Sequence, residues 1–240
     1  MNQTEIQLLR KGQGFHLPLS SPTPGFSLST VAERRYYCPV YTVTIPINLS
    51  TIYSNTMGDK QRLKEILLEK SYRKGTFTLT SGKTSDFYID GKQTILSAEG
   101  AYLCGKLLFE LLQKSNTVIH AVGGMTLGAD PLVTAVSIAS YLAKQPIPAF
   151  IVRKEAKGHG TGNYIEGLKN MPDGCTVALL EDVVTTGGTL LQVIERVEAA
   201  GFKVGLVATV VERQEGGVEV LKKAGYTLEA LFSREELLAA

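Results

Sequence analysis

The chain has few of the features that identify membrane-spanning or disulfide-rich proteins. It contains three cysteines in 240 residues. Cys38, Cys104 and Cys175 are too widely spaced to suggest a closed disulfide framework, and they show no metal-ligand spacing. No apolar run approaches the roughly 18 residues that span a bilayer. These absences predict reduced thiols, a cytoplasmic location and no membrane partner.

A strong excess of charge of one sign is also missing. Of the 25 basic and 23 acidic residues, four basic and two acidic ones lie in residues 1–56, which leaves 21 of each in residues 57–240. Proteins that bind nucleic acid present a basic face to the phosphates. The balanced charge of residues 57–240 therefore argues against a nucleic-acid partner.

The first 56 residues differ in composition from the rest of the chain. They contain 5 of the 9 prolines and 13 Ser or Thr residues. They show no helical periodicity, and strand-like alternation is confined to Tyr41–Ile47. We expect residues 1–56 to be a disordered extension, read from an early start codon or acting as a targeting segment, for example to a plastid. The apolar core of a secretory signal is missing, and we expect the folded domain to span residues 57–240.

Residues 177–189 carry the most informative pattern in the sequence. Four apolar residues, 177–180, predict a buried strand, and two adjacent carboxylates, Glu181 and Asp182, follow it. A Thr/Gly turn then leads into a helix that is expected to begin near Thr189. A turn from a strand into a helix presents free backbone N–H groups and the positive end of the helix dipole. The pattern therefore predicts an anion site beside an acid pair.

The side chains of this turn favour a sugar phosphate as the ligand. Hydroxyl donors and flexible glycines suit a phosphate, and the turn supplies both, at Thr185, Thr186, Gly187, Gly188 and Thr189. The two carboxylates would repel a phosphate but accept hydrogen bonds from neighbouring sugar hydroxyls. An ordinary α/β loop with a Thr/Gly helix cap is the alternative interpretation.

The rest of residues 57–240 alternates between strand and helix patterns. We expect strands at 76–79, 87–90, 117–122, 149–152, 203–212 and 227–232, and helices after Met57 and at 97–113, 127–142, 189–200 and 217–224. Strands that are continuously apolar and alternate with helices predict an α/β fold with a mainly parallel sheet flanked by helices. Ligands of such sheets bind at the carboxyl ends of strands, where Arg153, Arg213 and the acid pair fall.

A second polar segment, residues 153–162, follows one of these predicted strands. It contains four basic side chains, Arg153, Lys154, Lys157 and His159, and then three glycines at alternate positions. A basic loop with little apolar material suits a polyanion that must be covered and then released. A solvated charged loop is the alternative.

Both segments resemble known phosphoribosyltransferase motifs. Residues 177–189 closely resemble the signature by which type I phosphoribosyltransferases bind phosphoribosyl pyrophosphate (PRPP). The run Arg-Lys-Glu-Ala-Lys-x-His-Gly from Arg153 is similar to the catalytic loop of the orotate phosphoribosyltransferases, and residues 77–90 resemble the hairpin that covers the base in that family. The resemblance spans nearly all of residues 57–240. It implies the type I phosphoribosyltransferase fold with a small N-terminal hairpin and helix hood.

The resemblance also assigns an activity and site residues. It implies transfer of the phosphoribosyl group of PRPP to orotate, giving orotidine 5'-phosphate and pyrophosphate for UMP synthesis. The residues expected to bind PRPP are Arg153, Lys154, Lys157, His159, Glu181, Asp182, Val183, Val184, Thr185, Thr186, Gly187, Gly188 and Thr189. Catalytic roles fall to Lys157, His159 and Asp182, and orotate recognition falls to Thr185 and Arg213. Mg²⁺ is expected as the cofactor, carried by PRPP without direct protein ligands.

The resemblance further implies a homodimer whose two subunits share each active site. Lys154 would serve the site of its own subunit, whereas Arg153, Lys157 and His159 would contact PRPP bound to the partner. A phosphoribosyltransferase for another base, or a non-catalytic PRPP-binding regulator, is the alternative function.

Two positions depart from some family members. Thr80 and Leu127 stand where those members have lysines, and the second of these lysines contacts PRPP. Without them, we expect the backbone N–H groups of Gly123, Gly124 and Thr126 to bind an oxygen of the pyrophosphate.

Overall fold

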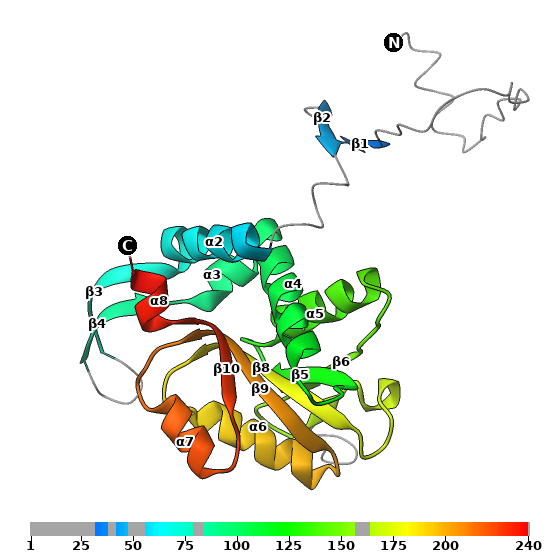
Figure 1. Ribbon diagram of the computed structural model, residues 1–240, viewed down its shortest axis with the longest axis vertical. Helices are drawn as coiled ribbons and strands as arrows, with labels where there is room; N and C mark the ends of the chain where they lie inside the picture. The colour runs from blue at the N-terminus through cyan, green and yellow to red at the C-terminus, as the bar shows by residue number, and fades with distance from the viewer. Residues whose placement is uncertain (1–31, 38–41, 48–55, 79–83, 157–163, 240) are drawn as a thin grey trace, which may run out of the picture. The chain divides into compact units, whose positions relative to one another are not determined.

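The computed structural model describes residues 32–37, 42–47, 56–78, 84–156 and 164–239, and the chain divides into two units, residues 1–54 and 55–240 (Figure 1). In the first unit, β1 (Ala32–Tyr37) and β2 (Thr42–Ile47) form an antiparallel hairpin. β2 lies within Tyr41–Ile47, the stretch in which the sequence shows strand-like alternation. Most of residues 1–56 lie outside the described residues, so the predicted disordered extension stays a prediction.

The second unit is built on a six-stranded sheet with the strand order β10-β9-β8-β5-β6-β7. Its strands are β5 (Ala121–Met125), β6 (Ala149–Val152), β7 (Ile165–Glu166), β8 (Thr176–Val184), β9 (Lys203–Glu212) and β10 (Leu228–Ser233). All neighbouring strands run parallel except β7, which pairs antiparallel with β6 at the sheet edge. The predicted mainly parallel sheet is confirmed.

Helices cover both faces of this sheet (Figure 1). α4 (Ala98–Lys114) and α5 (Asp130–Leu142) pack on one face, and α6 (Gly188–Ala199) and α7 (Gly217–Lys223) pack on the other. The side chains of β8 alternate between the two cores. Ala178 and Leu180 join the core that contains α4 and α5, and Val177 and Leu179 join the core that contains α6. Because both faces are buried, the strand needs the unbroken apolar run seen in its sequence.

A small hood precedes the sheet in the chain. It consists of α2 (Thr56–Ile66), a π-helical turn η2 (Leu67–Ser71), the antiparallel strands β3 (Tyr72–Thr78) and β4 (Thr84–Ile89), and the short helix α3 (Gly91–Ile95). Leu63, Ile66 and Leu67 are buried, as their helical spacing predicted. The C-terminal helix α8 (Arg234–Leu238) begins with a capping box between Ser233 and Glu236. Among the helices of the described part, none is long and apolar enough to cross a membrane.

The structure corrects the bounds of three predicted strands. The hood strands β3 and β4 begin four and three residues earlier than predicted. The strand expected at residues 117–122 runs over Ala121–Met125, and the preceding Val118 is 74% exposed. Gly123 and Gly124, expected at the start of a loop, both lie inside the strand. A Cβ on Gly123 would lie 2.2 Å from the Phe150 ring, and one on Gly124 would lie 2.3 Å from the Leu180 carbonyl oxygen. These glycines allow neighbouring groups to approach the strand closely, which is a packing requirement that a single sequence does not reveal.

Two further boundaries differ from prediction, and two short elements were not predicted. The helix expected from Leu127 begins at Asp130, and neither α3 nor β7 was predicted. β8 continues through the acid pair to Val184, so the turn is limited to residues 185–187. The carboxylates are therefore held by strand pairing with β9, which fixes them more firmly than a loop would.

Candidate active site

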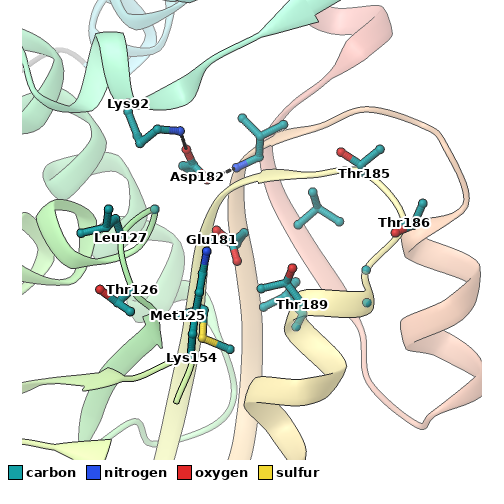
Figure 2. Close-up of a pocket in the computed structure, with 16 residues that line it drawn as sticks. Lys92, Met125, Thr126, Leu127, Lys154, Glu181, Asp182, Thr185, Thr186 and Thr189 are labelled. Atoms are coloured by element: carbon teal, nitrogen blue, oxygen red, sulfur yellow. Dashed lines mark hydrogen bonds and ion pairs between the residues drawn. The ribbon is translucent and has the colours of Figure 1, made fainter. Parts of the chain in front are cut away.

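A cavity of about 370 Å³ lies where the carboxyl ends of β5, β6 and β8 meet α3 and α6 (Figure 2). Among the residues predicted to bind PRPP, Lys154 and the whole run from Glu181 to Thr189 line it. The remaining lining residues are Lys92, Met125, Thr126, Leu127, Gly128 and Leu190. The structure thus brings the acid pair, the Thr/Gly turn and one loop cation to a single cavity.

The Thr/Gly turn forms the wall of this cavity at the N-terminus of α6. Gly187 has a φ of +79° and precedes the first turn of α6 without a side-chain cap. Residues other than glycine adopt this φ at a cost. Thr186, Gly188 and Thr189 are exposed to the cavity side, and a Cβ on Gly188 would approach no atom closer than 3.9 Å. The start of this 12-residue helix has no side-chain cap, so its N–H groups are available to an anion, and the anion site itself stays a prediction.

The acid pair forms the floor of the cavity. Glu181 and Asp182 are each only 8% exposed. Asp182 Oδ1 accepts a hydrogen bond from the Val183 backbone N–H at 2.9 Å. Glu181 Oε2 is buried and has no hydrogen-bond partner among the described residues. A Cβ on Gly128 would lie 2.9 Å from an oxygen of each carboxylate, so only glycine leaves the pair open from that side.

A lysine that sequence reasoning missed stands beside Asp182. Lys92 on α3 lines the cavity, and its Nζ lies 2.8 Å from Asp90 Oδ1 and 3.8 Å from Asp182 Oδ2 (Figure 2). The hydrogen bond to Asp90 raises the pKa of Lys92 against the opposing effect of burial, and Asp182 raises it further. Asp90 also caps α3 through the Lys92 backbone N–H. The Asp-x-Lys spacing after a strand was the available signal, but only the fold brings it to the acid pair.

Burial and a neighbouring charge both raise the pKa of Glu181. Desolvation raises the pKa of Glu181 well above its ordinary value of 4.5, and the negative charge of Asp182 raises it further. A backbone hydrogen bond from Asp182 and the charge of Lys92 act in the opposite direction, but they are outweighed. The pair therefore resists carrying two negative charges when no ligand is bound.

The raised pKa of Glu181 predicts the effect of Glu181→Gln on the ligand-free protein. Because folding raises the pKa of Glu181 above its ordinary value of 4.5, the wild type loses stability as pH rises from that value to the higher pKa. The loss is about 1.4 kcal/mol for each pH unit in this window. Glutamine does not ionise and escapes this loss. In thermal melts from pH 4 to pH 8, the melting temperature of the variant should rise relative to that of the wild type as the pH increases. Parallel curves would contradict the buried, unpaired carboxylate.

The first two residues of the predicted basic loop, Arg153 and Lys154, differ in whether they line the cavity. The Lys154 side chain extends into the cavity (Figure 2). Arg153 does not line this cavity. Its Nη1 lies 3.2 Å from Glu166 Oε1, and it lines a neighbouring hollow together with Thr126. Lys157 and His159, the two predicted catalytic loop residues, lie outside the described residues.

Arg213, predicted to bind orotate, lies outside the cavity lining but next to it. Its backbone N–H donates to the Val184 carbonyl at 3.0 Å, which places it beside the turn that begins with Thr185. Its side chain is 3% exposed and donates to Ser85 of the hood at 3.1 Å. It also lies 2.6 Å from Glu215 Oε1 and 4.5 Å over the Phe87 ring, while its Nε has no hydrogen-bond partner among the described residues.

One backbone expectation was wrong. The Thr126 N–H, expected to bind pyrophosphate, donates to the Val152 carbonyl at 3.0 Å, and Gly123 and Gly124 lie within β5. Leu127 is 73% exposed at the cavity, on a cis peptide after Thr126. Thr80 lies outside the described residues. Lys92 therefore supplies a cation at the cavity, whereas Leu127 does not.

Comparisons with known proteins agree with this geometry. Residues 94–231 match the family described as phosphoribosyl transferase domain. The chain is 47% identical over 178 residues to an orotate phosphoribosyltransferase of Nostoc sp., covering 74% of this chain and 84% of that protein.

Two crystal structures of orotate phosphoribosyltransferase from Mycobacterium tuberculosis are similar to this chain over three quarters of its length. One, in complex with Fe(III) dicitrate, is 34% identical, has a TM-score of 0.65, and the match covers 75% of this chain and 99% of that one. Another, in complex with PRPP, is 31% identical with a TM-score of 0.61, and the match covers 75% and 98%.

Proposed function

This chain belongs to the orotate phosphoribosyltransferase family, and from that premise we propose how its cavity binds the two substrates of the family. The activity is transfer of the phosphoribosyl group of PRPP to orotate, which gives orotidine 5'-phosphate and pyrophosphate. The observation that carries the proposal is the shared cavity, in which the acid pair of β8, the N-terminus of α6 and Lys154 meet.

The ribose phosphate binds along the end of β8. Glu181 and Asp182 accept hydrogen bonds from the ribose 2- and 3-hydroxyls, and the buried, unpartnered Glu181 Oε2 gives this binding a specific acceptor. The N–H groups and hydroxyls of residues 185–189 hold the 5-phosphate at the start of α6. Val183 and Val184 shape the strand wall between them.

Departure of pyrophosphate is the step that needs electrostatic help. Breaking the C1–oxygen bond leaves positive charge on the ribose and negative charge on the leaving group. Lys154 at the cavity, with Lys157 and His159, stabilises the leaving oxygens, and Asp182 stays close to the ribose. The orotate nitrogen attacks C1 directly, so no protein nucleophile is needed.

Mg²⁺ is proposed as the cofactor, held by the pyrophosphate oxygens of PRPP. Mg²⁺ commonly binds substrate phosphates and keeps several waters. The acid pair of the cavity, Glu181 and Asp182, is assigned to the ribose hydroxyls, so the phosphates of PRPP would hold the ion. When bound, the ion neutralises charge on the leaving pyrophosphate.

Orotate lies between Thr185 and Arg213 in this proposal. The planar guanidinium of arginine pairs well with a carboxylate. The partnerless Nε of Arg213 and its stacking on Phe87 of the hood support base recognition at this end of β9.

A homodimer with shared sites is also proposed. Arg153 and Lys154 are adjacent in sequence, yet only Lys154 lines the cavity of its own subunit. This division supports a loop in which Arg153, Lys157 and His159 reach PRPP bound to the partner.

Reduced, buried Cys104 and Cys175 support a cytoplasmic location.

The direct test is orotate consumption, followed by absorbance, with PRPP and Mg²⁺. Uracil, hypoxanthine and adenine are run beside orotate at equal concentration. Turnover confined to orotate is expected. Turnover of another base, or PRPP binding without turnover of any base, would overturn the assignment.

We also propose that residues 57–240 form the whole catalytic domain. The cavity, the sheet and the hood all come from this part of the chain. Deleting residues 1–56 should leave kcat, both KM values and the melting temperature unchanged within error. An insoluble or inactive truncated protein would show that the extension contributes to the folded domain.

A further inference from the structure

Arg196 has no role in the site described above, yet it contacts residues 153 and 154, where the loop that carries Lys154 begins. It lies on α6, the helix whose N-terminus borders the cavity. Its Nη1 donates to the Arg153 carbonyl oxygen at 2.6 Å, and its Nη2 donates to the Lys154 carbonyl oxygen at 3.1 Å. One guanidinium therefore holds two consecutive backbone carbonyls at the point where the chain leaves β6.

The same guanidinium also contacts the chain where it returns to the sheet. It stacks on the Tyr164 ring at 4.4 Å from the ring centroid, and the Tyr164 carbonyl accepts a hydrogen bond from the Arg153 N–H at 2.8 Å. Nη1 further lies 3.8 Å from the sulfur of Met125, a cavity residue at the end of β5. Arg196 thus contacts both ends of this loop and the end of β5.

The choice of arginine matters for this geometry. A guanidinium offers several N–H donors in a fixed plane, so it can bond two carbonyls and stack on a ring at the same time. Lysine offers a compact charge on a flexible stem and does not reproduce this arrangement. The contacts therefore specify the direction of the backbone at residues 153 and 154 rather than only adding charge.

We infer that Arg196 is a positioning residue for the reaction, which fixes the backbone at Arg153 and Lys154 so that the Lys154 side chain enters the cavity. The inference rests on the proposed function, because it assigns Arg196 an effect on PRPP through Lys154. A group that is displaced by about 1 Å from its productive position can lose about 10²-fold in rate.

A double-mutant cycle tests whether Arg196 acts through Lys154. The variants are Arg196→Met, which keeps the apolar stem, Lys154→Met, and the two combined. Each single change should lower kcat/KM for PRPP, by roughly 10²-fold for Lys154→Met and by roughly 10- to 10²-fold for Arg196→Met. The double variant should lose no more activity than Lys154→Met. Once the Lys154 side chain is gone, moving the backbone that carries it has no further effect on the rate. A double variant whose loss in kcat/KM equals the product of the two single losses would overturn the inference.

Three further variants separate positioning from general damage. Glu195→Met changes an exposed neighbour on the same helix and should leave the kinetics unchanged. Arg196→Lys should recover little of the loss, and Tyr164→Leu, which removes only the stacked ring, should give a smaller loss in the same parameter. If Arg196→Met does not fold, the cycle is repeated with Arg196→Lys. Full activity of Arg196→Lys would also overturn the inference.

The cycle distinguishes failure of this inference from failure of the proposed function. A wild type that turns over orotate, with independent losses at Arg196 and Lys154, refutes only the positioning role. A wild type that does not turn over orotate refutes the function. The PRPP affinity of the wild type and of each variant in the cycle is then measured by calorimetry. Coupled losses of affinity would still support the positioning role, and additive losses would refute it.

Discussion

Replacing Arg213 by methionine is expected to raise the KM for orotate by roughly 10- to 10²-fold per hydrogen bond lost, since bonds to a charged group contribute about 1.5–3 kcal/mol. The KM for PRPP should change little. Methionine keeps much of the buried side-chain volume at a position that is only 3% exposed. Steady-state kinetics with each substrate varied in turn measure the two values.

Glu215→Gln provides the matched control for this prediction. Glu215 Oε1 lies 2.6 Å from the Arg213 guanidinium, so its carboxylate pairs with the same group that is proposed to bind orotate. Removing its charge leaves Arg213 in place and frees it from a competing carboxylate, so the KM for orotate should not rise. Equal increases in both KM values for Arg213→Met, with a lowered melting temperature, would mean that Arg213 only supports the packing of Ser85 and Phe87.

The parts of the site that follow one strand could be predicted from sequence. A four-residue apolar run, an acid pair and a Thr/Gly turn are consecutive, so their order in β8 and α6 follows from local rules of strand and helix formation. The long strand β9 was predicted with its observed bounds for the same reason. Local patterning therefore located the cavity floor at Glu181 and Asp182 and the cavity wall at the start of α6.

The parts that depend on packing between distant segments were missed. Lys92 reaches Asp182 only because α3 packs against the end of β8, 90 residues further along the chain. Gly123 looked like a loop residue because the Phe150 ring that covers it belongs to another strand. The Thr126 N–H looked free because its acceptor is the carbonyl of Val152 on β6. Each error concerns a partner that no local pattern specifies.

Mixing two inactive variants should restore activity if each site is shared between subunits. Lys157→Ala removes a loop cation proposed to act on the partner's PRPP, and Asp182→Ala removes a ribose carboxylate from the cavity of its own subunit. Each homodimer should lose roughly 10²–10³-fold in kcat, the usual cost of one electrostatic group at a reacting centre. A mixed dimer holds one site with both groups intact and one site with neither.

The expected recovery follows from pairing statistics. Random reassortment makes half of the dimers mixed, and each mixed dimer has one working site of two, so about a quarter of wild-type activity should return. Subunit exchange is verified independently with two differently tagged chains, and mixing two samples of the same variant serves as the control. A mixture that stays inactive after confirmed exchange would place Lys157 over the site of its own subunit. In that case the division between Arg153 and Lys154 would reflect only the local direction of the two side chains.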